Sequence, residues 1–222
     1  MNKRITEIFC LITILIAMPA LAQYKSEENF NFANSKVSFS GLVTSSDSYQ
    51  LEASYHYMFN RYIGLGGAFG YWSVWYEDGW AAEKDWEIES DDNKPSNFYL
   101  RPSIVLKSPA LKIKQVDLGL YAEPGIMLNI PYQRINIRQY INWPDYDYKY
   151  VSTSKGQWFA IDLRVGIFVN FGPCGFSAGY IMSNLDVYSQ YRQLSYKGTS
   201  FSKYYPKKSF MQGAYLTASY YF

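Results

Sequence analysis

The sequence is poor in cysteine and histidine, and neither sign of charge is in excess. Its 222 residues include two cysteines and one histidine, with 21 Lys and Arg against 19 Asp and Glu. Cys10 lies in the amino-terminal leader, so the mature chain would keep only Cys174, which allows no intramolecular disulfide and no cysteine-based metal site. A formal net charge of +2 argues against nucleic-acid binding driven by bulk charge. We therefore expect no nucleic-acid partner, no metal and no cofactor.

Long hydrophobic runs are also missing. After residue 22, no apolar run approaches the ~18 residues of a membrane-spanning helix, and the mean hydropathy is −0.23. Aromatic residues make up 19% of the chain, with 23 Tyr. A β-barrel can be integral to a membrane at this hydropathy, because lipid-facing and lumen-facing side chains alternate along each strand. An excess of Tyr and Trp is typical of the girdles at the two membrane interfaces.

Residues 1–22 have the pattern of a cleaved secretory signal. Lys3 and Arg4 form a positive start, residues 8–18 are apolar, and residues 20–22 (Ala-Leu-Ala) form a small-x-small cleavage site. The apolar run is too short to span a membrane as a helix of ~20 residues. We predict a signal peptide at residues 1–22 and one β-rich domain at residues 23–222.

The last nine residues read as one strand that ends on an aromatic side chain. Every second residue shares a face, and this period of two indicates a strand. An ordinary edge strand of a soluble β-sandwich would show the same alternation. The pattern therefore indicates the closing strand of a membrane barrel only together with features elsewhere in the chain. One face carries Ala214, Leu216, Ala218, Tyr220 and Phe222, and the other carries Tyr215, Thr217, Ser219 and Tyr221.

Seven further segments alternate in the same way. Short connections follow the second, fourth and sixth strands, and long connections follow the third, fifth and seventh. The connection after the first strand is the one short loop on the long side. Sorted loop lengths are typical of bacterial membrane barrels, and a closed barrel leaves no unpaired backbone edge in lipid. The sequence therefore predicts an all-β, eight-stranded antiparallel transmembrane up-and-down barrel, with a β-hairpin inside the connection 131–156 and a bulge at Pro102. The predicted strands are 36–44, 49–59, 62–76, 96–107, 115–130, 157–171, 176–188 and 210–222.

With these features the chain resembles the small outer-membrane β-barrels of the OmpA and OmpX type, in a form common in Bacteroidetes-like bacteria. The resemblance covers nearly all of residues 36–222, and it depends on the leader, the strand pattern, the Asn60-Arg61 turn and the Tyr-Tyr-Phe terminus. It implies a location in the outer membrane of a Gram-negative bacterium and contact with the lipid bilayer. It also implies insertion by the outer-membrane machinery, which would read Tyr220 and Phe222. No peptidoglycan-binding domain follows Phe222, so that half of an OmpA-like role is not expected.

The inward faces of the predicted strands carry charged side chains. An eight-stranded barrel is just wide enough to be filled by side chains, and buried charges must be paired because an unpaired one is costly. We predict a salt-bridged plug that includes Glu52, Arg101, Glu123 and Arg164, and we favour a sealed lumen over a gate that switches pairs and conducts. The full predicted network is Glu52, His56, Arg101, Lys107, Asp117, Glu123, Asp162 and Arg164.

Two patterns that suggest other chemistry carry less weight. Glu52, Ser54 and His56 share one strand face, and these residue types together suggest the catalytic group of a hydrolase. Alternate residues on a strand lie ~7 Å apart, too far for a direct Ser–His hydrogen bond, so we expect no enzyme and no catalytic residue. The acidic stretch 83–92 lacks the spaced ligands and the turn glycine of a calcium loop, so we interpret it as a solvated face.

The long connections are rich in tyrosine. Rigid amphipathic aromatics together with arginine are favoured at binding surfaces, although many of these residues could equally be girdle or ribbon positions. The predicted binding surface consists of Tyr140, Trp143, Tyr146, Tyr148, Tyr150, Tyr191, Tyr196, Tyr204 and Tyr205.

The leading functional hypothesis is a barrel with a plugged lumen whose Tyr-rich extracellular loops act in surface binding or adhesion, to a protein or glycan ligand, or in envelope structure. The alternatives are a small ion or solute channel, an accessory barrel for protein export and, least favoured, a lipid-modifying enzyme. The sequence does not separate the first hypothesis from the export accessory.

Overall fold

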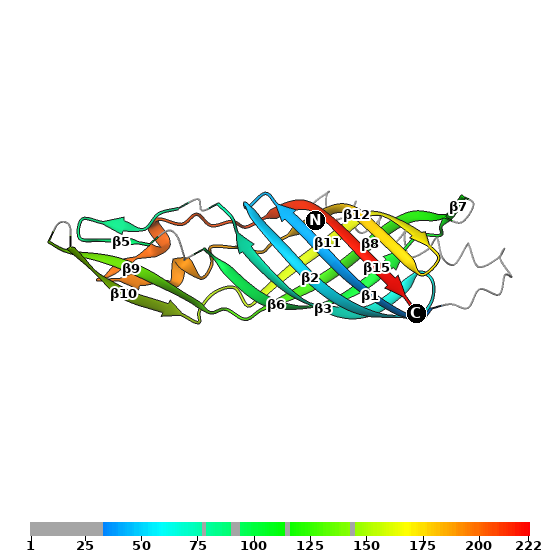
Figure 1. The fold of residues 1–222 in the computed structure, drawn as a ribbon, viewed down its shortest axis with the longest axis horizontal. Coiled ribbons are helices and arrows are strands. Elements are labelled where there is room, and N and C mark those ends of the chain that lie inside the picture. Colours follow the sequence, from blue (N-terminus) through cyan, green and yellow to red (C-terminus); the bar gives the residue numbers. More distant parts are fainter. Residues whose placement is uncertain (1–32, 77–78, 90–93, 114–115, 143–144) are drawn as a thin grey trace, which may run out of the picture.

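The computed structural model describes residues 33–76, 79–89, 94–113, 116–142 and 145–222. These residues form an elongated molecule with a β-barrel at one end and a smaller β-rich unit, here called the head, at the other (Figure 1). The predicted signal peptide lies outside the described residues, so it remains a prediction. No helix among the described residues is long and apolar enough to span a membrane.

Eight antiparallel strands form the barrel, and each is paired with its neighbours on both sides, β1 with β15 included. The all-β, eight-stranded up-and-down fold predicted from the sequence is therefore confirmed. The strands are β1 (Ser35–Thr44), β2 (Ser48–Met58), β3 (Ile63–Val74), β6 (Ser96–Lys107), β8 (Val116–Asn129), β11 (Phe159–Phe171), β12 (Cys174–Ser183) and β15 (Met211–Tyr221). A short strand, β7 (Leu111–Ile113), pairs with the start of β8.

The strand register determines the shape of the barrel. A path that crosses from each strand to its hydrogen-bonded neighbour leaves β1 at Thr44 and returns ten residues earlier, at Asn34. Eight strands with this stagger tilt by about 43° from the barrel axis, within the usual range, and an eleven-residue strand then spans ~27 Å along the axis, enough for a membrane's apolar core. The path runs through Thr44, Gly213, Ile181, Arg164, Glu123, Val105, Gly64, Met58 and Asn34.

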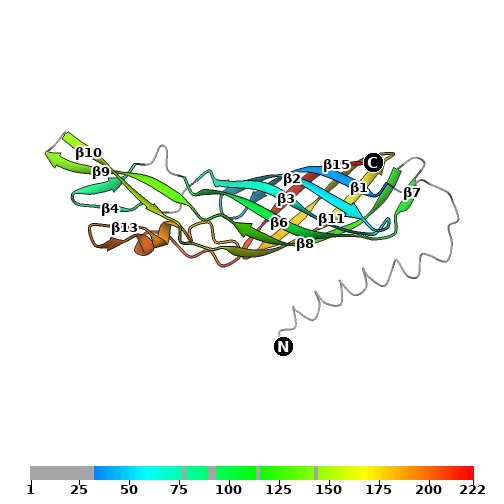
Figure 2. The same cartoon turned by 90° about the horizontal axis from the view of Figure 1, so that it is seen from below.

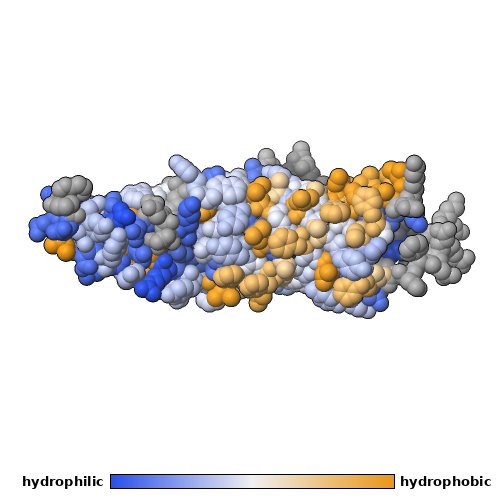
Figure 3. Space-filling model, in the orientation of Figure 1, coloured by the Kyte–Doolittle hydropathy of each residue, from blue (hydrophilic) through white to orange (hydrophobic). Residues whose placement is uncertain are grey.

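The outer surface of the barrel is apolar. The hydrophobic colour gathers over the barrel in Figure 3, whereas the head is mostly hydrophilic. A soluble monomer rarely exposes a contiguous apolar patch above ~600 Å², so this belt is suited to lipid rather than water. Large apolar side chains that point outward from the barrel strands include Phe39, Leu51, Leu65, Phe69, Phe98, Leu100, Ile104, Leu120, Ile126, Ile161, Ile167, Phe176 and Leu216.

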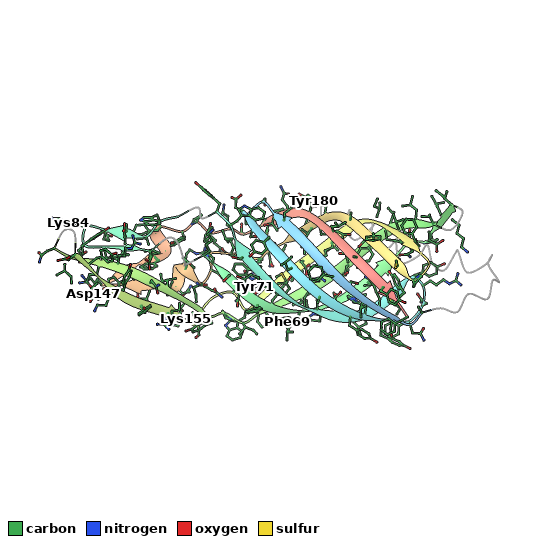
Figure 4. The ribbon with its side chains drawn as sticks, viewed as in Figure 1. Phe69, Tyr71, Lys84, Asp147, Lys155 and Tyr180 are labelled. Atoms are coloured by element: carbon green, nitrogen blue, oxygen red, sulfur yellow. The ribbon has the colours of Figure 1, made fainter. Side chains whose placement is uncertain are left out.

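Aromatic side chains gather toward both edges of this belt. Near the head, Tyr71 packs against Phe98 with ring centroids 5.1 Å apart, and Figure 4 shows Phe69, Tyr71 and Tyr180 on the outside of the barrel. At the opposite end, Tyr220 stacks on Phe222 at 6.3 Å. Two such groups are what the interfacial girdles of a membrane barrel require.

The head is built from the three long connections. β4 (Ala82–Glu83), β5 (Trp86–Ile88), β9 (Gln133–Asn142) and β10 (Asp145–Thr153) form a four-stranded sheet in the order β10-β9-β5-β4. The third connection adds the hairpin β13 (Ser195–Tyr196) and β14 (Thr199–Ser200), between the 3-10 turns η1 (Tyr191–Gln193) and η2 (Phe201–Lys203). Figure 2 shows that these parts lie together beyond the same end of the barrel.

Three details differ from the prediction. The strand expected at 176–188 ends at Ser183, and the residues after it enter the head. The predicted bulge at Pro102 is wrong, because the pairings of β6 with β8 keep one register on both sides of it. The connections 77–95 and 189–209 were expected as loops and instead contain strands that pair, because the tyrosine-rich chain buries apolar side chains there.

Candidate functional site

Arg101 lies at the centre of the barrel interior and contacts three carboxylates. It comes from β6, where alternation turns it inward, and it is fully buried. Its Nε donates to both Asp162 oxygens at 2.8 and 2.9 Å, its Nη1 pairs with the Glu123 carboxylate, and Nη2 donates to the Glu123 backbone carbonyl at 3.1 Å. The Oε1 of Glu52 lies 3.8 Å from the Nη1 of Arg101. One guanidinium thus joins β2, β6, β8 and β11 across the interior.

Arg164 forms the second half of this network. Its two terminal nitrogens donate to the two Glu52 oxygens at 2.8 and 2.7 Å, the bidentate geometry that makes arginine pairs strong. It also lies 3.7 Å from Asp162 and 4.0 Å from Glu123. Tyr99 adds a hydrogen bond to Glu52 at 3.1 Å. The carboxylates therefore each face both guanidiniums.

Lys36 belongs to the same interior, and the sequence analysis missed it. It is buried on β1, donates to the Tyr121 hydroxyl at 3.2 Å and lies 5.0 Å from that ring's centroid. Tyr121 in turn donates to Glu123. Two arginines and Lys36 thus match three carboxylates in charge, which offsets part of the cost of burying them. The signal was present, because Lys36 shares the inward face of its strand with Ser38 and Ser40.

Two predicted members of the network lie apart from it. Lys107 is buried and donates to the Tyr221 hydroxyl, with its Nζ 4.8 Å from the centroid of the Phe168 ring. Asp117 is only half-buried, at a position opposite Lys112 of β7. The structure therefore places both toward the short-turn end, away from the arginine centre.

His56 is fully buried and shares a hydrogen bond of 2.8 Å with Ser103, not with Ser54. The Ser103 hydroxyl donates to Glu123 at 3.1 Å, so its proton points away from the imidazole. A nucleophilic serine must instead donate to the histidine that activates it. The contact is a structural hydrogen bond inside the barrel.

A hydrophobic core unites the head with the mouth of the barrel. Trp86 stacks on Phe201 with centroids 5.5 Å apart, and Tyr191 packs edge-on against Tyr205 at 4.9 Å. The expectation that Tyr191 and Tyr205 form part of a binding surface is wrong, since both are buried. The core comprises Trp72, Val74, Ala81, Trp86, Ile88, Tyr99, Met127, Ile135, Ile137, Ala160, Leu185, Val187, Tyr188, Tyr191, Leu194, Phe201, Tyr205 and Met211.

Polar contacts fix the third long connection onto the head sheet. Tyr196 donates to Gln139 at 2.6 Å, and Tyr204 donates to the Ala82 carbonyl at 2.9 Å and to Glu83 at 2.7 Å. Both tyrosines are half-buried. They therefore hold the head together and offer little free surface.

The outer face of the head sheet carries the exposed tyrosines. Tyr146, Tyr148 and Tyr150 are 47%, 41% and 58% exposed on β10. The Cζ of Arg138 lies 5.6 Å from the centroid of the Tyr146 ring, and the Cζ of Arg134 lies 4.2 Å from the centroid of the Tyr150 ring. Tyr140 pairs with Tyr146 across the two strands, while Trp143 lies outside the described residues. We call this surface the tyrosine face.

The acidic stretch forms ion pairs within the head. The guanidinium of Arg138 hydrogen-bonds Glu89 at 3.0 Å and lowers the pKa of that carboxyl. Hydrogen bonds from Lys197 and Lys203 likewise lower the pKa of Asp85 and Glu83. Among the described residues, no group of three or more His, Cys, Asp or Glu is placed to hold a metal ion.

The two ends of the described chain meet at the short-turn end of the barrel. Ser35 and Phe222 exchange backbone hydrogen bonds of 3.0 and 2.9 Å. Tyr220 and Phe222 point outward and are 49% and 60% exposed. Recognition of Tyr220 and Phe222 by the outer-membrane insertion machinery remains a prediction.

No protein-family model matches this sequence, and neither does any curated protein. Among solved structures, the chain is similar to a major outer membrane protein from Thermus thermophilus, with 12% identity, a TM-score of 0.46, and coverage of 85% of this chain and 99% of that one. It is also similar to Neisserial surface protein A, with 9% identity, a TM-score of 0.41, and coverage of 85% and 96%. It is similar as well to the N-terminal β-barrel domain of Pseudomonas aeruginosa OprF, with 13% identity, a TM-score of 0.38, and coverage of 86% of this chain and 98% of that one. The strand pairings themselves give this chain the architecture of the small eight-stranded transmembrane barrels of the OmpA and OmpX type.

Proposed function

We propose that this chain is an integral outer-membrane barrel whose lumen is closed by its own side chains, and that it acts by binding a ligand with its head outside the cell. The apolar belt, the two aromatic edges and the closed sheet support insertion in a bilayer. Short turns would face the periplasm and the head would face outward, as in bacterial barrels. The predicted signal peptide would direct the chain to that membrane.

The observation that carries the proposal is the buried ion network across the barrel. Arg101 and Arg164 are at most 2% exposed, and together they contact three carboxylates from three strands. Charges that line a water-filled pore remain solvated, whereas these are held by one another. Above them the core of the head continues into the barrel mouth through Trp72, Tyr99 and Met211. Both features support a closed lumen over a channel.

The tyrosine face is the surface best suited to recognition. Its rings stand beside two guanidiniums and hold rigid positions on a strand, so binding orders few side chains. Arg138 is already paired with Glu89, which leaves the face close to neutral. We expect a ligand that stacks on rings, such as a glycan or a protein segment, rather than a highly charged polymer.

A catalytic role is less well supported. His56 and Ser103 are buried within the barrel, and the serine proton is directed to Glu123. A lipid substrate outside the barrel could not reach either side chain. The arrangement favours a non-enzymatic protein.

The test is binding of the labelled, folded protein to an array of glycans and extracellular matrix proteins. A variant with Tyr146, Tyr148 and Tyr150 all changed to Ser should lose at least 90% of the signal. The matched control changes Tyr76 and Trp80 to Ser, because both are exposed off β10, and it should bind as the wild type does. Equal binding by all three proteins would contradict a ligand site on the tyrosine face. The shift in gel mobility on boiling verifies that each barrel is folded.

A further inference from the structure

The head sheet has one open edge and one closed edge. β4, at one side, is two residues long, and Tyr204 donates to its Ala82 carbonyl. β10, at the other side, is nine residues long and pairs only with β9 among the described residues. Natural sheets shorten or cover their edges because an unpaired strand invites another strand. The contrast leaves the β10 edge open to pairing with another strand.

Symmetry restricts how two copies of this edge can pair. Two equivalent strands can exchange hydrogen bonds only when they run antiparallel, because each strand of a parallel pair bonds differently to its neighbour. β10 runs lengthwise along the head in Figures 1 and 2, and Figure 4 shows Asp147 near the tip and Lys155 closer to the barrel. An antiparallel pair therefore points the two barrels in opposite directions. Two such barrels lie in two opposed membranes.

The sequence of β10 is complementary to itself in one antiparallel register. With Tyr148 opposite Tyr148 of the second copy, Asp147 of each strand faces Lys149 of the other, and Tyr146 faces Tyr150. Centring the pair on Asp147 or Lys149 instead places like charges opposite each other, which is unfavourable. Asp147 and Lys149 share a face and already form a 2.6 Å ion pair, with 47% and 49% of their side chains exposed. They are positioned to form an alternating group of four charges.

We propose that the β10 edge binds the β10 edge of a second copy of this chain in a facing membrane, and so links two cells. The proposal assumes the outward-facing head of the proposed function but not its ligand. The charge complementarity of Asp147 and Lys149 favours a second copy over an unrelated segment. Tyr146, Tyr148 and Tyr150 would form a continuous ladder across the joined sheets.

The test uses the full mature protein inserted in uncharged phosphatidylcholine vesicles, with vesicle clustering followed by dynamic light scattering. Wild-type vesicles should cluster. Asp147→Lys and Lys149→Asp should each abolish clustering, because each variant places like charges opposite each other in the pairing register. Vesicles of the two variants, once mixed, should cluster again. In the mixed pair, the Lys introduced at position 147 faces the Asp introduced at position 149, and the native Lys149 faces the native Asp147. The double variant that carries both changes should cluster alone.

Several outcomes would overturn the proposal. Wild-type vesicles that stay separate while the protein is verified as folded would exclude a second copy as the occupant and leave an extended segment of another protein. Clustering by either single variant at the wild-type level, or failure of the mixture to cluster, would exclude this register. Crosslinking of two copies within one vesicle, without clustering, would exclude the facing-membrane geometry. Conductance of the barrel is measured separately, so a failure here does not imply an open lumen.

Discussion

Replacing Arg101 by Met should strongly destabilise the barrel. Met fills much of the same volume but leaves Asp162 and Glu123 without the guanidinium that contacts both. Arg164 stays 3.7 Å from Asp162 and 4.0 Å from Glu123, so part of the charge remains compensated. Removal of one partner from a buried pair typically costs 3–5 kcal/mol, and we expect about 4 kcal/mol here.

The free energy of unfolding would be measured by guanidinium titration of the protein folded in lipid vesicles, with tryptophan fluorescence as the signal. Arg61→Met is the matched control, because Arg61 is exposed in the turn between β2 and β3, and it should change the free energy by less than about 0.5 kcal/mol. A second change, Asp162→Asn, should restore part of the loss, because it removes one of the uncompensated charges. A loss below about 1 kcal/mol for Arg101→Met would refute the reasoning that this guanidinium holds the interior together.

Four further predictions follow from the same contacts. Gly125→Ala should cost about 2–4 kcal/mol in unfolding, because its Cβ would lie 2.6 Å from the Arg101 Nε and displace the guanidinium. Lys107→Met should cost only about 1 kcal/mol by the same titration, because Lys107 bonds a tyrosine hydroxyl and lies outside the arginine network. Trp86→Ala should destabilise the head core by roughly 3–5 kcal/mol and expose residues 79–89 to limited proteolysis, while the barrel keeps its heat-dependent gel mobility. Because the pKa of Glu89 is lowered by Arg138, this contact contributes to stability above about pH 4.5, the ordinary pKa of the carboxyl, and is lost as the pH falls below that value. Amide protection in the head, corrected for the intrinsic exchange rate at each pH, should therefore fall between pH 5 and about pH 3 while protection in the barrel stays constant, and Arg138→Gln should weaken this fall.

The alternation of side chains was enough to predict the barrel. Each barrel strand has one lipid-facing and one inward face, so a period of two gives both the strand and its orientation, as for Glu52 and Arg164. The same rule includes Lys36, which shares the inward face of β1 with Ser38 and Ser40. Which carboxylate each arginine contacts could not be read from the sequence, because that depends on the stagger of the closed sheet.

The head could be predicted only in part. The hairpin of β9 and β10 was expected from the alternation of Ile135 and Ile137 with polar residues, and the structure pairs these strands. Burial of Tyr191 and Tyr205 was not visible, because their segment has no regular period and packs against β-strands distant in sequence. Gly70 leaves room for the Tyr99 ring, whose Cζ would lie 2.2 Å from an added Cβ, and this contact between strands could not be read from the sequence.

The central claim is that the lumen is closed and that the protein acts through its head. Ion conductance of the refolded mature protein in a planar bilayer tests it most directly. The account predicts a silent bilayer from protein whose folded state is verified by gel mobility. Discrete conductance steps from the wild type that change with Arg101→Ala or Glu123→Ala would contradict it and make the buried ion network a gate.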